Sequence, residues 1–299
     1  MLGTAAGGGV PQWNCSCQFC ELCRTDSRRV VPRLQLQAIV SGDGQQWFLL
    51  NASPDLRLQI EANPELQPSS KFGRRNTPIH GIVLTSADLD QVLGVLLLRE
   101  FQPLTIYATA LVRKTLEANS FFRMLHRVAD QLTWVEIVPG RAFPLGASGI
   151  RCTPIALRGS LPFYARELDT GLPGQASLGL LLEKDGRRVA YTPAVPEITA
   201  ELRALYGSCD TVLMDGTFWS NAELSNTHQG TPAARAIGHV PLSGEDGTIA
   251  LLAGLDFPRR VFVHINNTNP ILDVQSEEYG AVVQAGWQVA HDGWQLDKS

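Results

Sequence analysis

The feature that most constrains this chain is a cluster of four cysteines near its N-terminus. Cys15, Cys17 and Cys20 fall within six residues, and Cys23 follows closely. Disulfide frameworks spread their cysteines apart to close loops, whereas a tight cluster suits a soft metal held by a local turn. Three thiolates at this spacing predict a tetrahedral zinc site that is structural, with Cys23 or a distant residue as the fourth ligand. The alternative is a loop of free or buried thiols.

Composition and charge restrict the class of protein and its partners. The chain has 299 residues, of which 44% are hydrophobic and 18% charged, so its core should be large. The net charge of −4 and the lack of a dense Lys/Arg stripe argue against nucleic acid as a partner. No apolar run is long enough for a membrane span and no signal-peptide pattern opens the chain, so we expect a cytoplasmic protein. The cysteine cluster suits that reducing compartment.

Short apolar and alternating runs predict strands with helices inserted between them. Strands are expected at 34–40, 47–50, 82–85, 105–108, 133–137, 150–155, 178–183, 188–192, 211–214 and 261–264. Helices are expected at 88–100, 111–118, 196–204, 244–253 and 273–285, the first burying Leu89, Val92, Leu93, Leu96 and Leu97. A hairpin turn is expected at 183–186. No repeat or linker divides the chain, which predicts one mixed α/β (α+β) domain over residues 1–299.

A polar loop joins the predicted strand 82–85 to the predicted helix 88–100. It carries Ser86, Asp88, Asp90 and Gln91. Asp88 with Gln91 three residues later is a capping-box pattern, and periodicity alone favours a helix cap there. A metal site is the other interpretation, and the two are compatible, since Asp90 could bind a metal while Asp88 caps.

Two further segments place polar side chains at the ends of buried strands. Asp215 and Gly216 follow an apolar strand, a pattern that usually marks a turn but would also suit a metal-bridging carboxylate. His264 ends an apolar strand and enters an Asn-rich loop, which favours a metal ligand or a proton donor. His239, in the segment GHVP, is a second functional candidate. The remaining histidines lack such a context and are expected at the surface or in satisfied contacts: His80, His126, His228 and His291.

Taken together, these segments resemble the family of coenzyme PQQ (pyrroloquinoline quinone) synthesis protein B, within the metallo-β-lactamase superfamily. The matching stretches lie between residues 2 and 272: LGTAAGGGVPQWNCSCQFC, LLNASPDLRLQI, TPIHGIVLTSADLDQVLGVLLLRE, MDGTFW, GHVPLSG and VHINNTNPIL. More distantly, the order of motifs resembles the transfer-RNA 3′-processing nucleases and the cyclic phosphodiesterase of phosphonate breakdown. By this resemblance the sequence opens inside the first strand of the fold, most of which we expect to be absent.

The resemblance implies an αββα metallo-β-lactamase sandwich with a metal site at one edge, between the sheets. By position, the residues in first-loop ligand positions are Asp88, Asp90 and Gln91, and the later aspartate and late histidine ligands are Asp215 and His264. The structural zinc ligands are Cys15, Cys17 and Cys20, with Asn267 as the fourth and Cys23 as its rival. The usual first loop reads HxHxDH, so its three histidines are missing here, and Gln91 replaces the one after the aspartate. The oxygen-rich set that remains suits iron(II) or manganese better than zinc.

The resemblance also implies a function. The family is expected to use iron to hydroxylate the tyrosine of a Glu–Tyr-derived precursor cut from a small peptide. His239 or Ser86 would then handle protons or substrate. The expected partners are that small-molecule or short-peptide precursor and other proteins of the PQQ pathway. The alternative is a carrier that takes PQQ or its precursor toward the periplasm.

Overall fold

The computed structural model describes residues 1–172, 174–227, 230–256 and 258–296, in which helices and strands are mixed. His228 lies outside the described residues. Contacts along the chain group it into two units. The first unit holds Met1, Gly3–Leu36 and Gly186–Ser299, and the second holds Leu2 and Gln37–Asp185. Within the described ranges, no helix is both long and apolar enough to cross a membrane.

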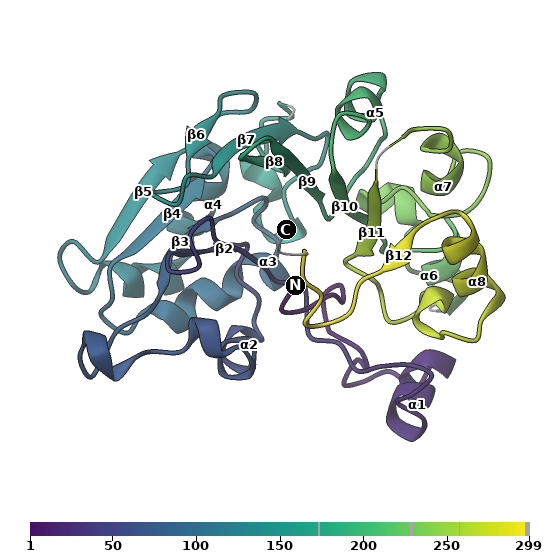
Figure 1. Ribbon diagram of the computed structural model, residues 1–299, viewed down its shortest axis with the longest axis horizontal. Coiled ribbons are helices and arrows are strands. Elements are labelled where there is room, and N and C mark those ends of the chain that lie inside the picture. The colour runs from purple at the N-terminus through teal and green to yellow at the C-terminus, as the bar shows by residue number, and fades with distance from the viewer. Residues whose placement is uncertain (173, 228–229, 257, 297–299) are drawn as a thin grey trace. The chain divides into compact units, whose positions relative to one another are not determined.

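The first unit contains four parallel strands in the order β12-β11-β10-β9, drawn from yellow (β12) to green (β9) in Figure 1. Their bounds are β9 Arg187–Thr192, β10 Thr211–Asp215, β11 Arg259–Val263 and β12 Gln288–Val289. Every residue of β10 is buried, as expected of a parallel strand covered on both faces. The carboxyl ends of β10 and β11 therefore meet at one edge, which is where ligands usually bind in parallel sheets.

Short helices connect and flank these strands. They are α1 Gln18–Thr25, α5 Ala200–Tyr206, α6 Glu223–Thr227, α7 Thr248–Leu251 and α8 Glu277–Gln284, with the 3₁₀ helices η6 Ala234–Ile237 and η7 Pro270–Leu272. Two of the α-helices begin at a side-chain cap, since the hydroxyls of Thr199 and Ser276 accept from backbone N–H groups in the first turns of α5 and α8. The N-terminal segment joins the unit through bridges from Ala5 to Gln35 and to Ile265.

The second unit contains a five-stranded sheet in the order β1-β2-β3-β4-β5, parallel except for the β1–β2 pair. Its strands are β1 Ala38–Val40, β2 Trp47–Leu50, β3 Ile79–Val83, β4 Leu104–Ala108 and β5 Leu132–Glu136. Three antiparallel strands also lie in this unit: β6 Phe143–Pro144, β7 Arg151–Ala156 and β8 Leu178–Lys184. The core of this unit is aliphatic and includes Leu49, Ile82, Val92 and Ile106, all fully buried.

The helices of the second unit are short. They are α2 Leu56–Ala62, α3 Leu89–Val92 and α4 Ala110–Ala118, with the 3₁₀ helices η1 Pro64–Leu66, η2 Ser70–Phe72, η3 Leu93–Leu98, η4 Ser120–His126 and η5 Phe163–Leu168. The turn expected at 183–186 is present, because Asp185 and Gly186 both have positive φ angles, 49° and 79°.

The helix expected over 88–100 is wrong in length and in its buried face. Helix α3 ends at Val92 and a 3₁₀ helix follows, because the backbone bonds elsewhere: Ala52 N–H donates to Gln91 O at 2.7 Å, and Gly94 N–H donates to Ala52 O at 2.9 Å. A Cβ atom on Gly94 would lie 2.2 Å from Ser53 O, so only glycine allows this approach. In consequence Leu89, Leu93 and Leu97 are exposed, while Val92 is buried as predicted.

The other expected elements are present, strand 47–50 with the predicted bounds and the rest with bounds shifted by one or more residues. Strand 34–40 is reduced to β1 preceded by isolated bridges, and the helices expected at 196–204, 244–253 and 273–285 begin later than predicted. Helices α1, α2 and α6 and the two-residue strands β6 and β12 were not predicted; α2, α6, β6 and β12 are too short to leave a clear period in the sequence.

Candidate metal centres

The cysteine cluster is divided between a loop and helix α1. Cys15 and Cys17 precede the helix, whereas Cys20 and Cys23 lie on it and are buried. Arg24, in the last turn, donates to Cys15 O at 2.6 Å and so closes the loop on the helix. The Sγ atoms of Cys15, Cys17 and Cys20 lie within 4.8 Å of one another, and in the described part of the chain Cys23 is outside this group.

Asn267 brings a fourth side chain to the three sulfurs from the other end of the unit. Its side-chain nitrogen Nδ2 lies 3.2 Å from Cys15 Sγ, 3.4 Å from Cys20 Sγ and 3.8 Å from Cys17 Sγ. Because the two ends of a carboxamide have nearly the same shape, a half-turn about the last torsion presents Oδ1 to the same point. This position favours Asn267 over Cys23 as the fourth ligand.

The pKa values of the clustered thiols shift in different directions. Burial opposes the thiolate at Cys15, but hydrogen bonds from the Cys17 N–H and from neighbouring side chains lower the pKa of Cys15 below its usual value. Burial, with the neighbouring sulfurs, raises the pKa of Cys17 to about 12. Three thiolates this close together need a positive charge among them, and a buried set of soft sulfur ligands suits zinc. The residues therefore fit the structural zinc predicted from the sequence.

A second cluster lies at the carboxyl edge of the parallel sheet. Asp215 is the last residue of β10 and pairs in register with Val263, the last residue of β11, so His264 follows at the same edge. His239 lies in the loop after η6. Gly238, the residue that follows this helix, has the left-handed conformation. The ligand atoms of Asp215, His239 and His264 lie within 4.8 Å of one another.

The carboxylate of Asp215 is fully buried and accepts four hydrogen bonds. Oδ2 accepts from Val195 N–H at 2.8 Å and from His239 Nδ1 at 2.8 Å, while Oδ1 accepts from the Thr217 N–H at 3.0 Å and the Thr217 hydroxyl at 2.6 Å. Burial alone would raise the pKa of Asp215, but His239, then His264 and Thr217, keep it below the usual value. Since these bonds use its acceptor sites, the geometry favours Asp215 as a carboxylate that orients histidines over one that binds metal directly.

Asp215 and Thr217 set the tautomers of the two imidazoles. The ionised Asp215 has no proton to give, so Nδ1 of His239 donates to it. Thr217 gives its one hydroxyl proton to Asp215, so its oxygen accepts from Nδ1 of His264 at 2.8 Å. In their neutral forms both rings therefore carry the lone pair on Nε2, and they stack with centroids 5.4 Å apart. Two oriented imidazole nitrogens are a donor set that zinc and iron(II) both accept.

The first-loop residues lie in the second unit, around the end of β3. The Ser86 hydroxyl donates to Asp88 Oδ2 at 2.7 Å and lies 3.1 Å from Gln91 Oε1. The Thr85 hydroxyl lies 3.0 Å from the same Gln91 oxygen. Ser86 and Gln91 are buried, whereas Asp88 and Asp90 are half-buried. The structure thus brings Ser86, Asp88 and Gln91 into one network, with Asp90 on the first turn of α3.

The capping box expected at this helix start is not formed. Asp88 is the residue before α3, but its side chain makes no cap bond to the helix and instead accepts from Ser86. The Gln91 carboxamide faces Thr85 and Ser86. The cap interpretation of Asp88 and Gln91 is therefore wrong, because nearby hydroxyls occupy both side chains.

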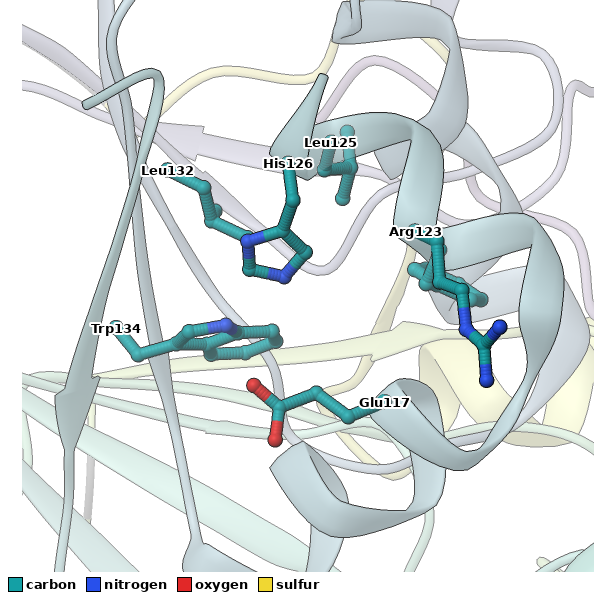
Figure 2. Close-up of a pocket in the computed structure, with 7 residues that line it drawn as sticks. Glu117, Arg123, Leu125, His126, Leu132 and Trp134 are labelled. Atoms are coloured by element: carbon teal, nitrogen blue, oxygen red, sulfur yellow. The ribbon is translucent and has the colours of Figure 1, made fainter. Parts of the chain in front are cut away.

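The other described histidines lie at the surface, as predicted. His80, His126 and His291 are exposed. His126 lines a cavity of about 170 Å³ between α4, η4 and β5, where Figure 2 shows its ring facing the Trp134 indole. None of the candidate site residues lines this cavity.

Sequence reasoning missed Thr217, which joins Asp215 to His264, and it gave His239 a role in proton handling without considering it as a ligand. The available signal for Thr217 was its place two residues after the strand-ending Asp215. A threonine in a turn is too common to single out, however.

The chain matches known proteins over most of its length. The model of the beta-lactamase superfamily domain matches residues 46–265. Coenzyme PQQ synthesis protein B of Methylorubrum extorquens is 41% identical over 299 residues, which cover 99% of this chain and 98% of that protein.

Solved structures give the same result for the fold. The crystal structure of Zn²⁺-bound PqqB from Methylobacterium extorquens superposes with a TM-score of 0.93 at 41% identity, covering 99% of this chain and 98% of that one. A diphosphatase of the PhnP family has a TM-score of 0.66 at 20% identity, over 99% of this chain and 94% of its own, and shares the fold. The predicted metallo-β-lactamase fold is confirmed.

Proposed function

This chain belongs to the family of coenzyme PQQ synthesis protein B within the beta-lactamase superfamily, and we propose that it is a metal-dependent oxygenase of PQQ biosynthesis. Its substrate is the tyrosine ring of a Glu–Tyr-derived precursor. In the reaction a ring C–H becomes C–OH with one oxygen atom of O₂, while the other leaves as water. A two-electron donor and two protons balance the reaction. The relatives' names refer to synthesis and not to transport.

The observation that supports this proposal is the pair of imidazoles at the edge of the parallel sheet. His239 and His264 each carry the lone pair on Nε2, held there by Asp215 and Thr217. Two histidines with a carboxylate are typical of non-haem iron(II) oxygenases. Here the carboxylate of Asp215 accepts from His239 directly and is connected to His264 through the Thr217 hydroxyl. Iron(II), when bound, would supply the activation of dioxygen.

This chain's own residues then have distinct roles. His239 and His264 would hold the metal through Nε2, and Asp215 fixes the ring of His239 while Thr217 fixes that of His264. Because a metal at Nε2 and the bond from Nδ1 to Asp215 use both ring nitrogens, the role in proton handling expected of His239 from the sequence is not part of this proposal. The first-loop residues Ser86, Asp88, Asp90 and Gln91 stay a prediction from the family resemblance, with the three last as ligands and Ser86 in proton or substrate handling. The protein partners and the cytoplasmic location stay predictions as well.

The test is anaerobic reconstitution with iron(II), followed by a Glu–Tyr-derived peptide, a chemical reductant and ¹⁸O₂. We expect one labelled oxygen atom in the tyrosine ring, and none with the zinc-loaded protein or with the His264→Ala variant. Retention of the peptide or of PQQ on the protein without any change in mass would overturn the oxygenase and support a carrier.

A further inference from the structure

The segment from His264 to Asn267 belongs to both metal centres. His264 presents its ring to Asp215 and Thr217, and three residues later the Asn267 side chain reaches the sulfurs of the cysteine cluster. The two centres are therefore joined by a very short piece of backbone, which runs entirely within the first unit.

The backbone of His264 is held in a conformation that non-glycine residues seldom adopt. Its φ angle is +58°, in the left-handed region, although the residue is buried and directly follows a parallel strand. Such a conformation persists only where the surroundings over-determine it. What holds the residues after His264 therefore decides whether its ring stays in place.

Backbone and side-chain bonds hold these residues on both sides. Ile265 N–H donates to Thr4 O at 2.9 Å, and Asn266 N–H donates to Thr217 O at 3.1 Å. The Asn269 side chain donates to Gly216 O at 2.9 Å and to Thr217 O at 3.2 Å. Thr217 is thus held by the same loop whose first residue, His264, it orients.

Asn267 is the residue of this loop whose side-chain contacts are with the cysteine site. Its side chain contacts the sulfurs of Cys15 and Cys20, and its carbonyl oxygen accepts from Cys17 Sγ at 3.6 Å. With a cation among the sulfurs, a bond to Oδ1 of Asn267 would replace weak sulfur contacts with a firm one.

We propose that Asn267 is a positioning residue for His264, so that metal in the cysteine site sets the metal affinity of the histidine site. Filling the cysteine site fixes Asn267, and the loop then holds His264 in its strained conformation with Nε2 toward the second metal. Emptying the cysteine site releases that loop and weakens the second site. The cysteine centre would thereby act on the reactive centre besides stabilising the fold. The inference rests on the metal binding of the proposed function but not on its oxygen chemistry.

Cobalt(II) titration of the full chain tests the coupling, because sulfur-to-cobalt charge-transfer bands report the cysteine site and d–d bands of nitrogen- and oxygen-bound cobalt report the other. With zinc already in the cysteine site, we expect Asn267→Ala to lower cobalt(II) affinity at the histidine site about tenfold, the lower end of the effect of orienting groups around a metal. The matched control is Asn266→Ala, which keeps the backbone bond to Thr217 and loses only a contact with Thr268; it should bind as the parent does.

A second measurement avoids dependence on how the variant folds. Zinc is removed from the parent protein with a chelator and then restored, and the histidine site is titrated in both states with manganese(II), which thiolates bind poorly, by electron paramagnetic resonance. A lower affinity in the zinc-free state that recovers with zinc supports the coupling. Equal affinities in both states, together with parental affinity in Asn267→Ala, would overturn it. Failure to hydroxylate the peptide would leave these titrations unaffected, so the two proposals fail separately.

Discussion

The hydroxyl of Thr217 lies 2.8 Å from Nδ1 of His264 and fixes which nitrogen of that ring carries the proton. The same hydroxyl donates to Asp215 at 2.6 Å, so one oxygen atom orders two of the three members of the cluster. Replacing it tests whether the cluster binds metal through oriented imidazoles.

We expect Thr217→Val to lower iron(II) affinity by roughly 10–100-fold, the usual effect of losing a group that orients a metal-binding histidine. The variant should also be destabilised by about 1–3 kcal/mol, because a buried Asp215 oxygen loses a donor. Anaerobic titration with iron(II) and urea unfolding measure the two effects. Thr217→Ser, which retains the hydroxyl, is the matched control, and equal iron affinity in the Val and Ser variants would contradict the role of the hydroxyl.

The cysteine site can be tested by measuring how much zinc the protein loses when its ligands are replaced. The triple change of Cys15, Cys17 and Cys20 to Ser should remove one zinc per chain and lower the thermal midpoint, since metal binding contributes to folding. Cys23→Ser is the control, because Cys23 is equally buried on α1 but stands outside the sulfur group. Zinc is measured by elemental analysis. Full zinc content in the triple variant would rule out the site, and zinc loss in Cys23→Ser would make Cys23 the fourth ligand.

His264→Ala should abolish metal binding at the histidine site and leave the zinc of the cysteine site in place. The change leaves His239 as the one imidazole of that cluster, and a single imidazole with a hydrogen-bonded carboxylate holds a transition metal poorly. The measurement is iron and zinc content after anaerobic reconstitution, with His291→Ala, at an exposed position, as control. Unchanged iron binding in His264→Ala would exclude it as a ligand.

The raised pKa of Glu223 should make the free energy of unfolding depend on pH. Burial raises its pKa to about 7 despite hydrogen bonds from Thr268 and Trp219 N–H. Because the folded pKa lies above the unfolded value of 4.5, the folded state binds more protons between these values. The free energy of unfolding should therefore fall as pH rises from about 4.5 to 7, by about 3 kcal/mol from this group. Urea unfolding across that range should show the slope in the parent and a smaller one in Glu223→Gln; equal slopes would contradict the prediction.

The sequence predicted the strands better than the groups that orient the site. Strand β10 is a continuous apolar run that ends at Asp215, so the strand and its carboxyl edge could be inferred from the local sequence pattern. The orientation of His264 could not, because it depends on a positive φ angle and on contacts with Thr217, 47 residues away. The shortened helix at Asp88 follows in the same way from the bonds between Ala52 and the Gln91–Gly94 turn, which no local pattern reveals.

Gln91 decides whether the first loop retains a ligand position. The Ser86 hydroxyl has one proton, which goes to Asp88 at 2.7 Å, and the Thr85 hydroxyl can give its own to Asn51 Oδ1 at 3.0 Å. Both oxygens can then accept from Gln91 if its carboxamide turns over, which places Nε2 toward the hydroxyls and leaves Oε1 on the opposite side. In that orientation the carboxamide oxygen is available to a metal.

We therefore expect Gln91→His to raise iron(II) affinity, by roughly tenfold. The N–H of the histidine ring can donate to the Ser86 or Thr85 oxygen. The other ring nitrogen then carries its lone pair at the position that Oε1 takes in the turned-over carboxamide, and an imidazole is a stronger ligand than a carboxamide. No helix cap is lost, since neither Asp88 nor Gln91 caps α3 through its side chain. Parallel anaerobic titrations of the parent, Gln91→His and Gln91→Leu measure the effect, the leucine variant keeping the volume without a ligand atom. Equal iron affinities in all three proteins would show that Gln91 serves only the hydroxyl network.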